Sequence, residues 1–423
     1  MRPIVNDALT DEFTELLRGL TGVARDFDPQ PVWITQPLHT VYAPGDRCTV
    51  DTPVEWQDEA LAAVAQAGGF AALATAIGVA ADWRSGSAAS AERRIRRQPI
   101  ADLRIDFEDG YGTRSDTEED RDARAAGAAA AAIRRSAEAP DRIGIRIKPL
   151  DTRGAHRGLR TLERFLDAYG EAGGFEGADA SLRITLAKVM HSEQISVLDR
   201  VLRRLEVRHQ LVTQTLQIEV QVEVPHLIAS VLDTGALDRI SANPRVRALH
   251  FGTYDYTSAL GIVPSEQHSL HPVAVHAKRV MQAVAATHAI EVCDGSSNLL
   301  PTGSAEQRLH AWRTHANLVT TGLRDGLPQG WDLHPAQLAS RFLAGHAVLR
   351  AEVPSAIERL VLAHDGVTHG IADEPATLRM MAAVIARALR VGAIEHEEVV
   401  RADTRLTPSL LEHVARTGRI MAV

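Results

Sequence analysis

Two stretches, LQIEVQVEVP at residues 216–225 and VRALHFGTYD at residues 246–255, indicate the fold and the candidate site together. Each begins as a strand-like run rich in apolar, mostly β-branched or aromatic residues, and each leads to an acidic side chain, Glu223 or Asp255. One strand–helix unit separates the two acids. In a barrel of parallel strands the carboxyl ends of the strands open on one mouth, so both carboxylates are expected to converge there.

Eight strand-like runs alternate with helix-like segments between residue 39 and about residue 345. The runs are residues 39–43, 103–107, 143–147, 182–189, 216–222, 246–251, 290–293 and 330–333. Helical patterns fill the gaps, among them residues 120–137, 192–205, 225–234 and 272–288. This order predicts an α/β protein with a (β/α)₈ TIM barrel. A doubly wound open sheet is the alternative, but it usually has a Gly-rich phosphate loop after its first strand, and Pro44-Gly45-Asp46 is not one.

We expect three regions along the chain. Residues 1–38 contain an amphipathic helix at 7–20 and a linker, residues 39–345 form the barrel, and residues 346–423 form an all-helical extension that acts as a lid or an oligomer contact. Before the second strand, residues 70–101 add a helix and a Gly/Ser/Ala/Arg stretch.

Composition excludes several classes of partner. The chain has 423 residues, of which 45% are hydrophobic, so it can bury a large core. Its net charge of −8 is spread among interspersed acids and bases, which argues against nucleic-acid and membrane-surface binding. The start lacks the apolar core of a signal peptide, and no apolar run is long enough to span a bilayer. Two cysteines provide no disulfide framework, so we expect a cytoplasmic protein.

Lysine is rare, which draws attention to each one. Of the 46 Lys and Arg residues only Lys148, Lys188 and Lys278 are lysines. Lys148 and Lys188 both fall at predicted strand ends. Lys188 is a candidate catalytic residue that neutralises a carboxylate or oxyanion or forms a Schiff base; the alternative is a structural lysine that holds neighbouring acids.

The second predicted strand runs into clustered acids in LRIDFEDGYG, residues 103–112. Clustered carboxylates raise one another's pKa, which suits general acid–base chemistry, so Glu108 and Asp109 are candidate catalytic residues. Caps for the following helix are the alternative. Arg146 lies on an otherwise apolar strand, and burying its charge costs free energy unless an opposite charge pairs with it. Its guanidinium group can form paired hydrogen bonds with a carboxylate, either of the substrate or of Glu108. A purely structural salt bridge is the alternative.

Other strand ends complete the expected mouth. Gly252 and Thr253 precede Asp255 in a turn that can present backbone N–H groups to an anion, although a simple strand terminator is the alternative. We expect Asp46, Arg146, Gly252 and Thr253 to contact the substrate. Hard oxygen ligands with room for water suit Mg²⁺, so Glu223 and Asp255 are the candidate metal ligands. The remaining polar ends are Lys148, Asp294 and His334.

A set of short motifs, taken in order, resembles the HpcH/HpaI aldolase and citrate lyase β-subunit-like family. The matching segments are Val41-Tyr-Ala-Pro-Gly-Asp-Arg47, Ile105-Asp-Phe-Glu-Asp109, Asp120-Arg-Asp-Ala-Arg124, Ile145-Arg-Ile147, Ala187-Lys-Val189, Val222-Glu-Val-Pro225, the run from Phe251 to Gly261, and Leu333-His-Pro-Ala-Gln337. Lys148, Ala187 and Val224 depart from the family pattern, in which Asn, Pro and Thr are expected. The segment between the first two strands is also longer than usual.

The resemblance implies a phosphoenolpyruvate/pyruvate-type barrel that binds Mg²⁺, or alternatively Mn²⁺, through Glu223 and Asp255. It implies carbon–carbon bond cleavage or formation in a 2-oxo acid, a hydroxy-dicarboxylate or an acyl-CoA derivative, with Arg146 on the substrate and a homo-oligomeric assembly. Glu108 and Asp109 would orient Arg146 and a water. The alternatives are a Schiff-base aldolase that uses Lys188, a thioester hydrolase, and a non-catalytic ligand-binding or assembly protein.

Overall fold

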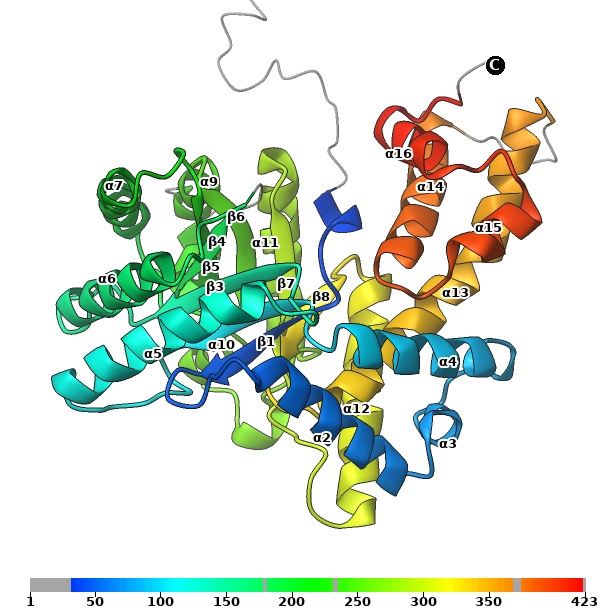
Figure 1. The fold of residues 1–423 in the computed structure, drawn as a ribbon. Helices are drawn as coiled ribbons and strands as arrows, with labels where there is room; N and C mark the ends of the chain where they lie inside the picture. The colour runs from blue at the N-terminus through cyan, green and yellow to red at the C-terminus, as the bar shows by residue number, and fades with distance from the viewer. Residues whose placement is uncertain (1–31, 178–180, 231–234, 368–373, 421–423) are drawn as a thin grey trace, which may run out of the picture.

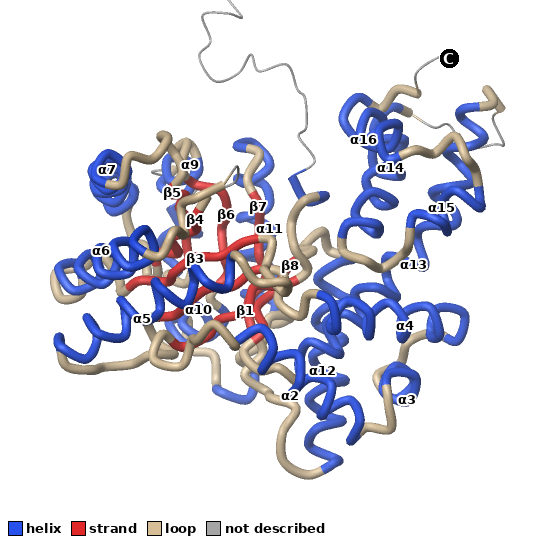
Figure 2. Tube along the Cα trace, viewed as in Figure 1, coloured by secondary structure: helices blue, strands red, loops and turns tan. Residues whose placement is uncertain are grey.

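Eight parallel strands close into a barrel in chain order, and β1 pairs with β8 to complete the ring (Figures 1 and 2). The computed structural model describes residues 32–177, 181–230, 235–367 and 374–420. The strands are β1 (His39–Pro44), β2 (Asp102–Asp106), β3 (Arg142–Ile147), β4 (Leu182–Leu186), β5 (Leu216–Val222), β6 (Val246–Phe251), β7 (Glu291–Ser296) and β8 (Gln329–Asp332). Closure confirms the predicted TIM barrel and excludes the open sheet.

The predicted strand limits agree with the structure to within one residue except at two strands. The run 182–189 ends early, at Leu186, and Lys188 beyond it has the left-handed φ of 52°, which turns the chain out of the strand. The run 290–293 extends to Ser296, because β7 carries an irregularity in its pairing with β8 that apolar patterning does not reveal.

Helices cover the outside of the barrel. They are α5 (Asp116–Arg134), α6 (Ala155–Glu171), α7 (Ser192–Arg208), α8 (Pro225–Ala229), α9 (Ala236–Ser241), α10 (Thr253–Ala259), η3 (Pro264–Glu266), α11 (Pro272–His288) and α12 (Ala305–Arg324). The helix expected at 225–234 is α8, which ends at Ala229, and residues 231–234 lie outside the described part of the chain.

A second group of helices lies beside the barrel, on the right of Figure 1. It comprises α2 (Thr52–Gln66), α3 (Phe70–Ala76), α4 (Ala81–Arg97), α13 (Gln337–His364), α14 (Pro375–Arg390), α15 (His396–Ala402) and α16 (Pro408–Thr417). The β1–β2 insertion thus packs with the C-terminal helices, and α4 lies against α13. We call this group the helical extension. Since α13 runs continuously through residue 345, the chain passes from barrel to extension within one helix.

Hydrogen bonds hold the helical extension against the chain segment that leads into β1. Arg387 of α14 is buried and donates to the carbonyl oxygens of Gln36 at 2.7 Å, Pro328 at 3.2 Å and Trp33. Trp33 belongs to η1 (Val32–Ile34), and the helix expected at 7–20 lies outside the described residues. Within the described part of the chain no single helix is long and apolar enough to cross a membrane. One bent pair, α2 with α3, meets the length and composition test only when its two helices are taken together.

The barrel interior is charged, which the sequence analysis did not predict. Apolar side chains such as Leu103 and Ile105 alternate along β2 with Asp102 and Arg104, and all four are fully buried. Arg104 donates to Asp102 at 2.5 Å and, through Nε and Nη2, to Glu219 of β5 at 2.7 and 2.5 Å. Buried charges are tolerated only when they are paired in this way, so the strands depend on Arg104 for charge balance.

We predict that Arg104→Met destabilises the protein by about 3–5 kcal/mol at neutral pH, because Asp102 and Glu219 then remain buried without their partner. Burial acts to raise the pKa of Glu219, but Arg104 and His250 outweigh it and lower the pKa below its usual 4.5. The stabilisation is therefore present above pH 4.5 and declines as the pH falls below it. Denaturant titrations at several pH values measure this difference.

Arg96→Met is the matched control for this prediction. Arg96 makes an exposed ion pair with Glu92 one helical turn away in α4, so its loss is expected to cost less than about 0.5 kcal/mol. Equal losses in the two variants, or a loss in Arg104→Met that does not change with pH, would contradict the role given to the interior network.

Candidate active site

The carboxyl ends of the strands surround a pocket of about 380 Å³. It is lined by Tyr42, Pro44, Asp106, Asp109, Gly110, Arg146, Gln221, Glu223, Gly252, Thr253, Tyr254, Asp255, Ser296, Trp331 and Leu333. Six of these were expected from the sequence, namely Asp109, Arg146, Glu223, Gly252, Thr253 and Asp255. The pocket therefore gathers residues from β1, β2, β3, β5, β6, β7 and β8 or from the loops that follow these strands.

Glu223 is the buried acid at the base of this pocket. Its Oε1 accepts the backbone N–H of Lys188 at 2.5 Å, and its Oε2 accepts Nε2 of Gln221 at 2.6 Å. Burial, together with the nearby carboxylates of Asp255 and Glu108, raises the pKa of Glu223 to about 8. Gly252 makes this packing possible, because a Cβ at position 252 would lie 2.5 Å from Cβ and 2.6 Å from Oε2 of Glu223.

Lys188 connects two acids in the loop after β2 with one in α10. Its Nζ donates to Oε1 of Glu108 at 2.6 Å and to Oδ1 of Asp109 at 3.1 Å, and it lies 3.9 Å from Oδ2 of Asp255. Burial acts to lower the pKa of Lys188, but Glu108, Asp109 and Asp255 outweigh burial and raise the pKa. Lys188 is therefore an ammonium ion that binds acids in this structure.

Arg146 is held by a partner to which the sequence analysis gave no role. Its Nε and Nη2 each donate to Asp106 at 2.6 Å, whereas Oε2 of Glu108 lies 3.5 Å from Nη1 and Oε1 of Gln221 accepts from Nη1 at 3.3 Å. The guanidinium carbon lies 4.8 Å from the ring centroid of Tyr42. The guanidinium group, which was expected to bind Glu108 or the substrate, therefore binds Asp106 through two of its nitrogen atoms. Its third nitrogen, Nη1, has only the longer contacts with Gln221 and Glu108.

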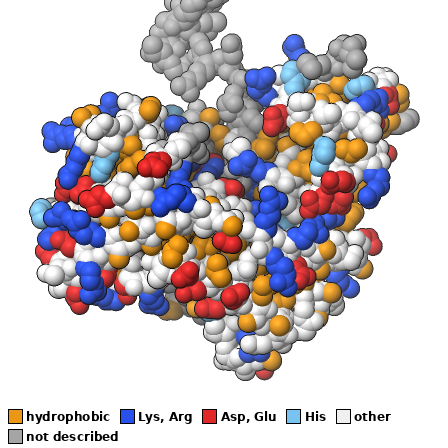
Figure 3. Space-filling view, viewed as in Figure 1, with side chains coloured by type: hydrophobic (Ala, Val, Ile, Leu, Met, Phe, Trp, Pro, Cys, Tyr) orange, Lys and Arg blue, Asp and Glu red, His pale blue; other side chains and the backbone are white. Residues whose placement is uncertain are grey.

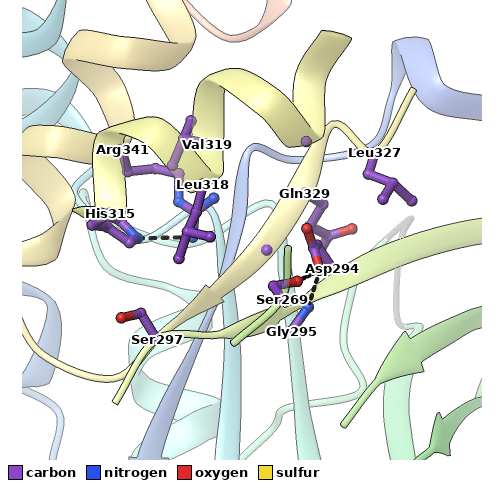
Figure 4. Close-up of a pocket in the computed structure, with 12 residues that line it drawn as sticks. Ser269, Asp294, Gly295, Ser297, His315, Leu318, Val319, Leu327, Gln329 and Arg341 are labelled. Atoms are coloured by element: carbon purple, nitrogen blue, oxygen red, sulfur yellow. Dashed lines mark hydrogen bonds between the residues drawn. The ribbon is translucent and has the colours of Figure 1, made fainter. Parts of the chain in front are cut away.

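Some expected strand-end residues lie elsewhere. Asp46 does not line the pocket and instead lies 3.4 Å from Arg114. Lys148 pairs with Glu119 of α5 at 3.0 Å. Asp294 points away from the mouth and contacts Lys278 at 2.9 Å and Ser269, beside a separate small cavity (Figure 4).

The sequence analysis also missed several residues of the mouth. Tyr42, Gln221 and Trp331 line the pocket beside Arg146, and Asp106 orients it. The missed signal is the two-residue alternation of polar side chains, which places Gln221 on the same face of the β5 chain as Glu223. The rings of Tyr42 and Trp331 pack together, tilted by 38° with their centroids 4.5 Å apart, and nothing in the sequence links these distant residues before the barrel is closed.

The donor set of this pocket suits a hard divalent cation. Glu223 and Asp255 supply two carboxylates, and burial, with the negative charges of Asp255 and Glu108, raises the pKa of Glu223. Among the described residues no group of three or more His, Cys, Asp or Glu side chains is placed to hold a metal. A cation held by Glu223 and Asp255 would therefore take its other ligands from water or a small molecule, as Mg²⁺ commonly does.

We predict that Gly252→Ala weakens Mg²⁺ binding at least about tenfold, because the new Cβ overlaps Glu223 and must displace its carboxylate. Gly345→Ala in α13 is the control, since its Cβ would meet only the ends of flexible side chains, Leu38 at 3.3 Å and Leu323 at 3.7 Å. Calorimetric titration with Mg²⁺ measures both variants. Unchanged affinity in Gly252→Ala would show that Glu223 is not a ligand.

Comparison with known proteins agrees with this fold. No curated protein matches the sequence. A citrate lyase from Burkholderia xenovorans LB400 has a similar structure, with 19% sequence identity and a TM-score of 0.58 over 87% of this chain and 96% of that chain. CitE from Mycobacterium tuberculosis, solved in complex with magnesium, acetoacetate and coenzyme A, has 15% identity and a TM-score of 0.48 over 85% and 99% of the two chains. The similarity to the Burkholderia structure, together with the closed ring of eight strands, confirms the barrel fold implied by the motif resemblance.

One family model covers nearly the whole chain. It matches residues 24–418, which include the barrel, the β1–β2 insertion and the C-terminal helices. The chain belongs to the family described as a domain of unknown function, DUF6986.

Proposed function

We propose that this protein is a Mg²⁺-dependent carbon–carbon lyase or aldolase that acts on a 2-oxo acid, a hydroxy-dicarboxylate or an acyl-CoA derivative. The observation that carries the proposal is that Glu223, Asp255 and Arg146 face one pocket of about 380 Å³. Two hard ligands beside a guanidinium match a substrate with a carboxylate and an adjacent oxygen. The similarity in fold to a citrate lyase is consistent with this class of reaction.

Substrate binding rests on Arg146 in this proposal. Asp106 fixes the plane of the guanidinium through two bonds of 2.6 Å, and Tyr42 supports its face at 4.8 Å. Nη1, with partners at 3.3 and 3.5 Å, has the capacity to donate to a substrate carboxylate. The volume of the pocket is near the lower end of the range for small-molecule sites, which favours a compact reacting acid.

We assign proton transfer to the loop that follows β2. Burial raises the pKa of Glu108 despite Arg146 and Lys188, so Glu108 is the better general acid or base. The Lys188 ammonium, 2.6 Å from Glu108, would stabilise negative charge that develops near that carboxylate. A bound Mg²⁺ would supply Lewis-acid polarisation of a carbonyl oxygen. Glu223 and Asp255 would hold that ion.

The alternatives have less support. A Schiff-base aldolase needs a neutral amine, but the pKa of Lys188 is raised by its acidic neighbours. Borohydride trapping with oxaloacetate or pyruvate should therefore leave Lys188 unlabelled. A thioester hydrolase and a non-catalytic binding protein would use the same pocket, and only the products formed distinguish them from a lyase.

We predict that the purified protein cleaves at least one member of a panel of 2-oxo acids, hydroxy-dicarboxylates and acyl-CoA esters. The activity should disappear in EDTA and return with Mg²⁺ or Mn²⁺. Asp255→Asn should lower kcat/KM about 100-fold or more, since a ligand is lost, whereas Asp238→Asn in α9 should leave it unchanged. Product analysis by mass spectrometry identifies the broken bond.

Three results would reject the lyase proposal. Activity that is indifferent to EDTA would exclude the metal, and Mg²⁺ binding without turnover across the panel would favour a binding protein. Release of free CoA without carbon–carbon cleavage would indicate a thioester hydrolase instead.

The raised pKa of Glu223 predicts a pH dependence of metal binding. Its carboxyl group is mostly protonated below its pKa of about 8, and a cation must displace that proton. Mg²⁺ affinity should rise as the pH is raised towards 8 and level off above it. At pH 6.5 close to one proton should be released per ion, which titration in buffers of different ionisation enthalpy measures. Glu223→Gln should release none, and equal release in both proteins would contradict the assignment.

A further inference from the structure

A basic hollow lies at the end of the barrel opposite the mouth. It has a volume of about 770 Å³ and is bounded by the C-terminal ends of α4 and α14 and by the segment before β3. Its charged lining residues are Arg93, Arg94, Arg97, Asp141, Arg390 and Glu395. Asp141 directly precedes the first residue of β3, which places the hollow at the amino ends of the strands. In Figure 3 Lys and Arg side chains lie along the furrow between the barrel and the helical extension.

The charges of this hollow are not balanced from within. Arg93 pairs with Glu395 at 2.9 Å. Arg94, Arg97 and Arg390 make no ion pair with any carboxylate in the part of the chain that the structure describes. Four arginines against two acids leave an excess of two positive charges, although the whole chain has a net charge of −8. Such a concentration of one sign in a concave surface attracts anions.

Arg94, which lines the hollow, carries a hydrogen-bond donor that has no partner in the described part of the chain. Its Nε is buried and has no hydrogen-bond partner among the described residues. Its guanidinium carbon lies 5.9 Å from the ring centroid of Phe342 in α13, so the side chain packs against that helix. Burial lowers the pKa of Arg94, and the like charges of Arg97 and Arg390 add to this effect while Asp141 opposes it. An anion bound in the hollow would relieve this repulsion.

Helix electrostatics accounts for only part of the arrangement. Basic side chains in the last turn of α4 interact favourably with the C-terminal end of the helix dipole. However, Arg93 and Arg97 repel each other at the i,i+4 spacing. Arg390 comes from a different helix, α14, and faces the same hollow. The convergence of arginines from two helices is what points to a ligand.

We propose that the hollow binds a small molecule that carries two or more phosphate groups. Guanidinium groups bind phosphate oxygens through paired hydrogen bonds, and arginines on two facing helices can engage more than one phosphate. The volume lies within the range of small-molecule sites. Among the described residues that line the hollow none is aromatic, so the phosphates and not a stacked base are recognised. The proposal does not rest on the function assigned to the mouth.

Calorimetric titration of the full-length protein with pyrophosphate and tripolyphosphate tests this site. EDTA in the buffer keeps divalent cations from the probes and from the mouth. One molecule should bind per chain, at least about tenfold more tightly than inorganic phosphate. The double variant Arg97→Glu/Arg390→Glu should abolish binding. Arg96→Met should retain it, because Arg96 lies in the same helical turn but pairs with Glu92 at 2.8 Å.

Circular dichroism shows whether the double variant is folded, and the single variant Arg390→Ala, at an exposed position, provides a second test with an expected loss of at least about tenfold. The proposal is overturned if neither probe gives saturable heat with the wild-type protein. It is also overturned if Arg390→Ala binds as well as wild type, or if Arg96→Met loses as much affinity as Arg390→Ala.

Discussion

The electrostatic balance around Lys188 is the constraint on which the mouth of the barrel depends. Its ammonium contacts Glu108 and Asp109 and lies near Asp255, while its backbone N–H binds Glu223. Together with Asp106, these make five acidic side chains at one end of the barrel, opposed by the cations Lys188 and Arg146. Burial and the neighbouring carboxylates together raise the pKa of Glu223. A divalent cation would correct this imbalance, which is why the mouth suits a metal better than an anion alone.

The polar interior explains how these side chains are held. Arg104 links Asp102 and Glu219 across the barrel. Closer to the mouth, Asp106 binds Arg146. Thr185 also donates to Glu219 at 2.8 Å, so each charged group has more than one partner. Such networks are costly to break and fix side-chain positions closely. Arg146 is therefore oriented before any substrate binds, which is the kind of preorganisation that catalysis requires.

The barrel was predictable from sequence because alternating strand and helix patterns are local signals. Glu223 and Asp255 were found for the same reason, since each follows its own strand. The pairing of Arg146 with Asp106 was not, because it depends on the register of β2 against β3, which places the two residues opposite each other and which neither strand's own sequence specifies. Asp294 and Lys148 were misleading, since a polar residue at a strand end can face the outer helices, as the contacts of Asp294 with Lys278 and of Lys148 with Glu119 demonstrate. The basic hollow joins α4 to α14, nearly 300 residues apart, and no local pattern connects them.

The central claim is that Glu223 and Asp255 share one divalent cation at the mouth of the barrel. Anomalous diffraction from crystals soaked in Mn²⁺ tests it most directly, because the signal locates the ion without assumptions about substrate. The account predicts one strong peak within coordination distance of both carboxylates, and none there in crystals of Glu223→Gln. A peak bound elsewhere, or no peak between these two side chains at saturating Mn²⁺, would contradict the account.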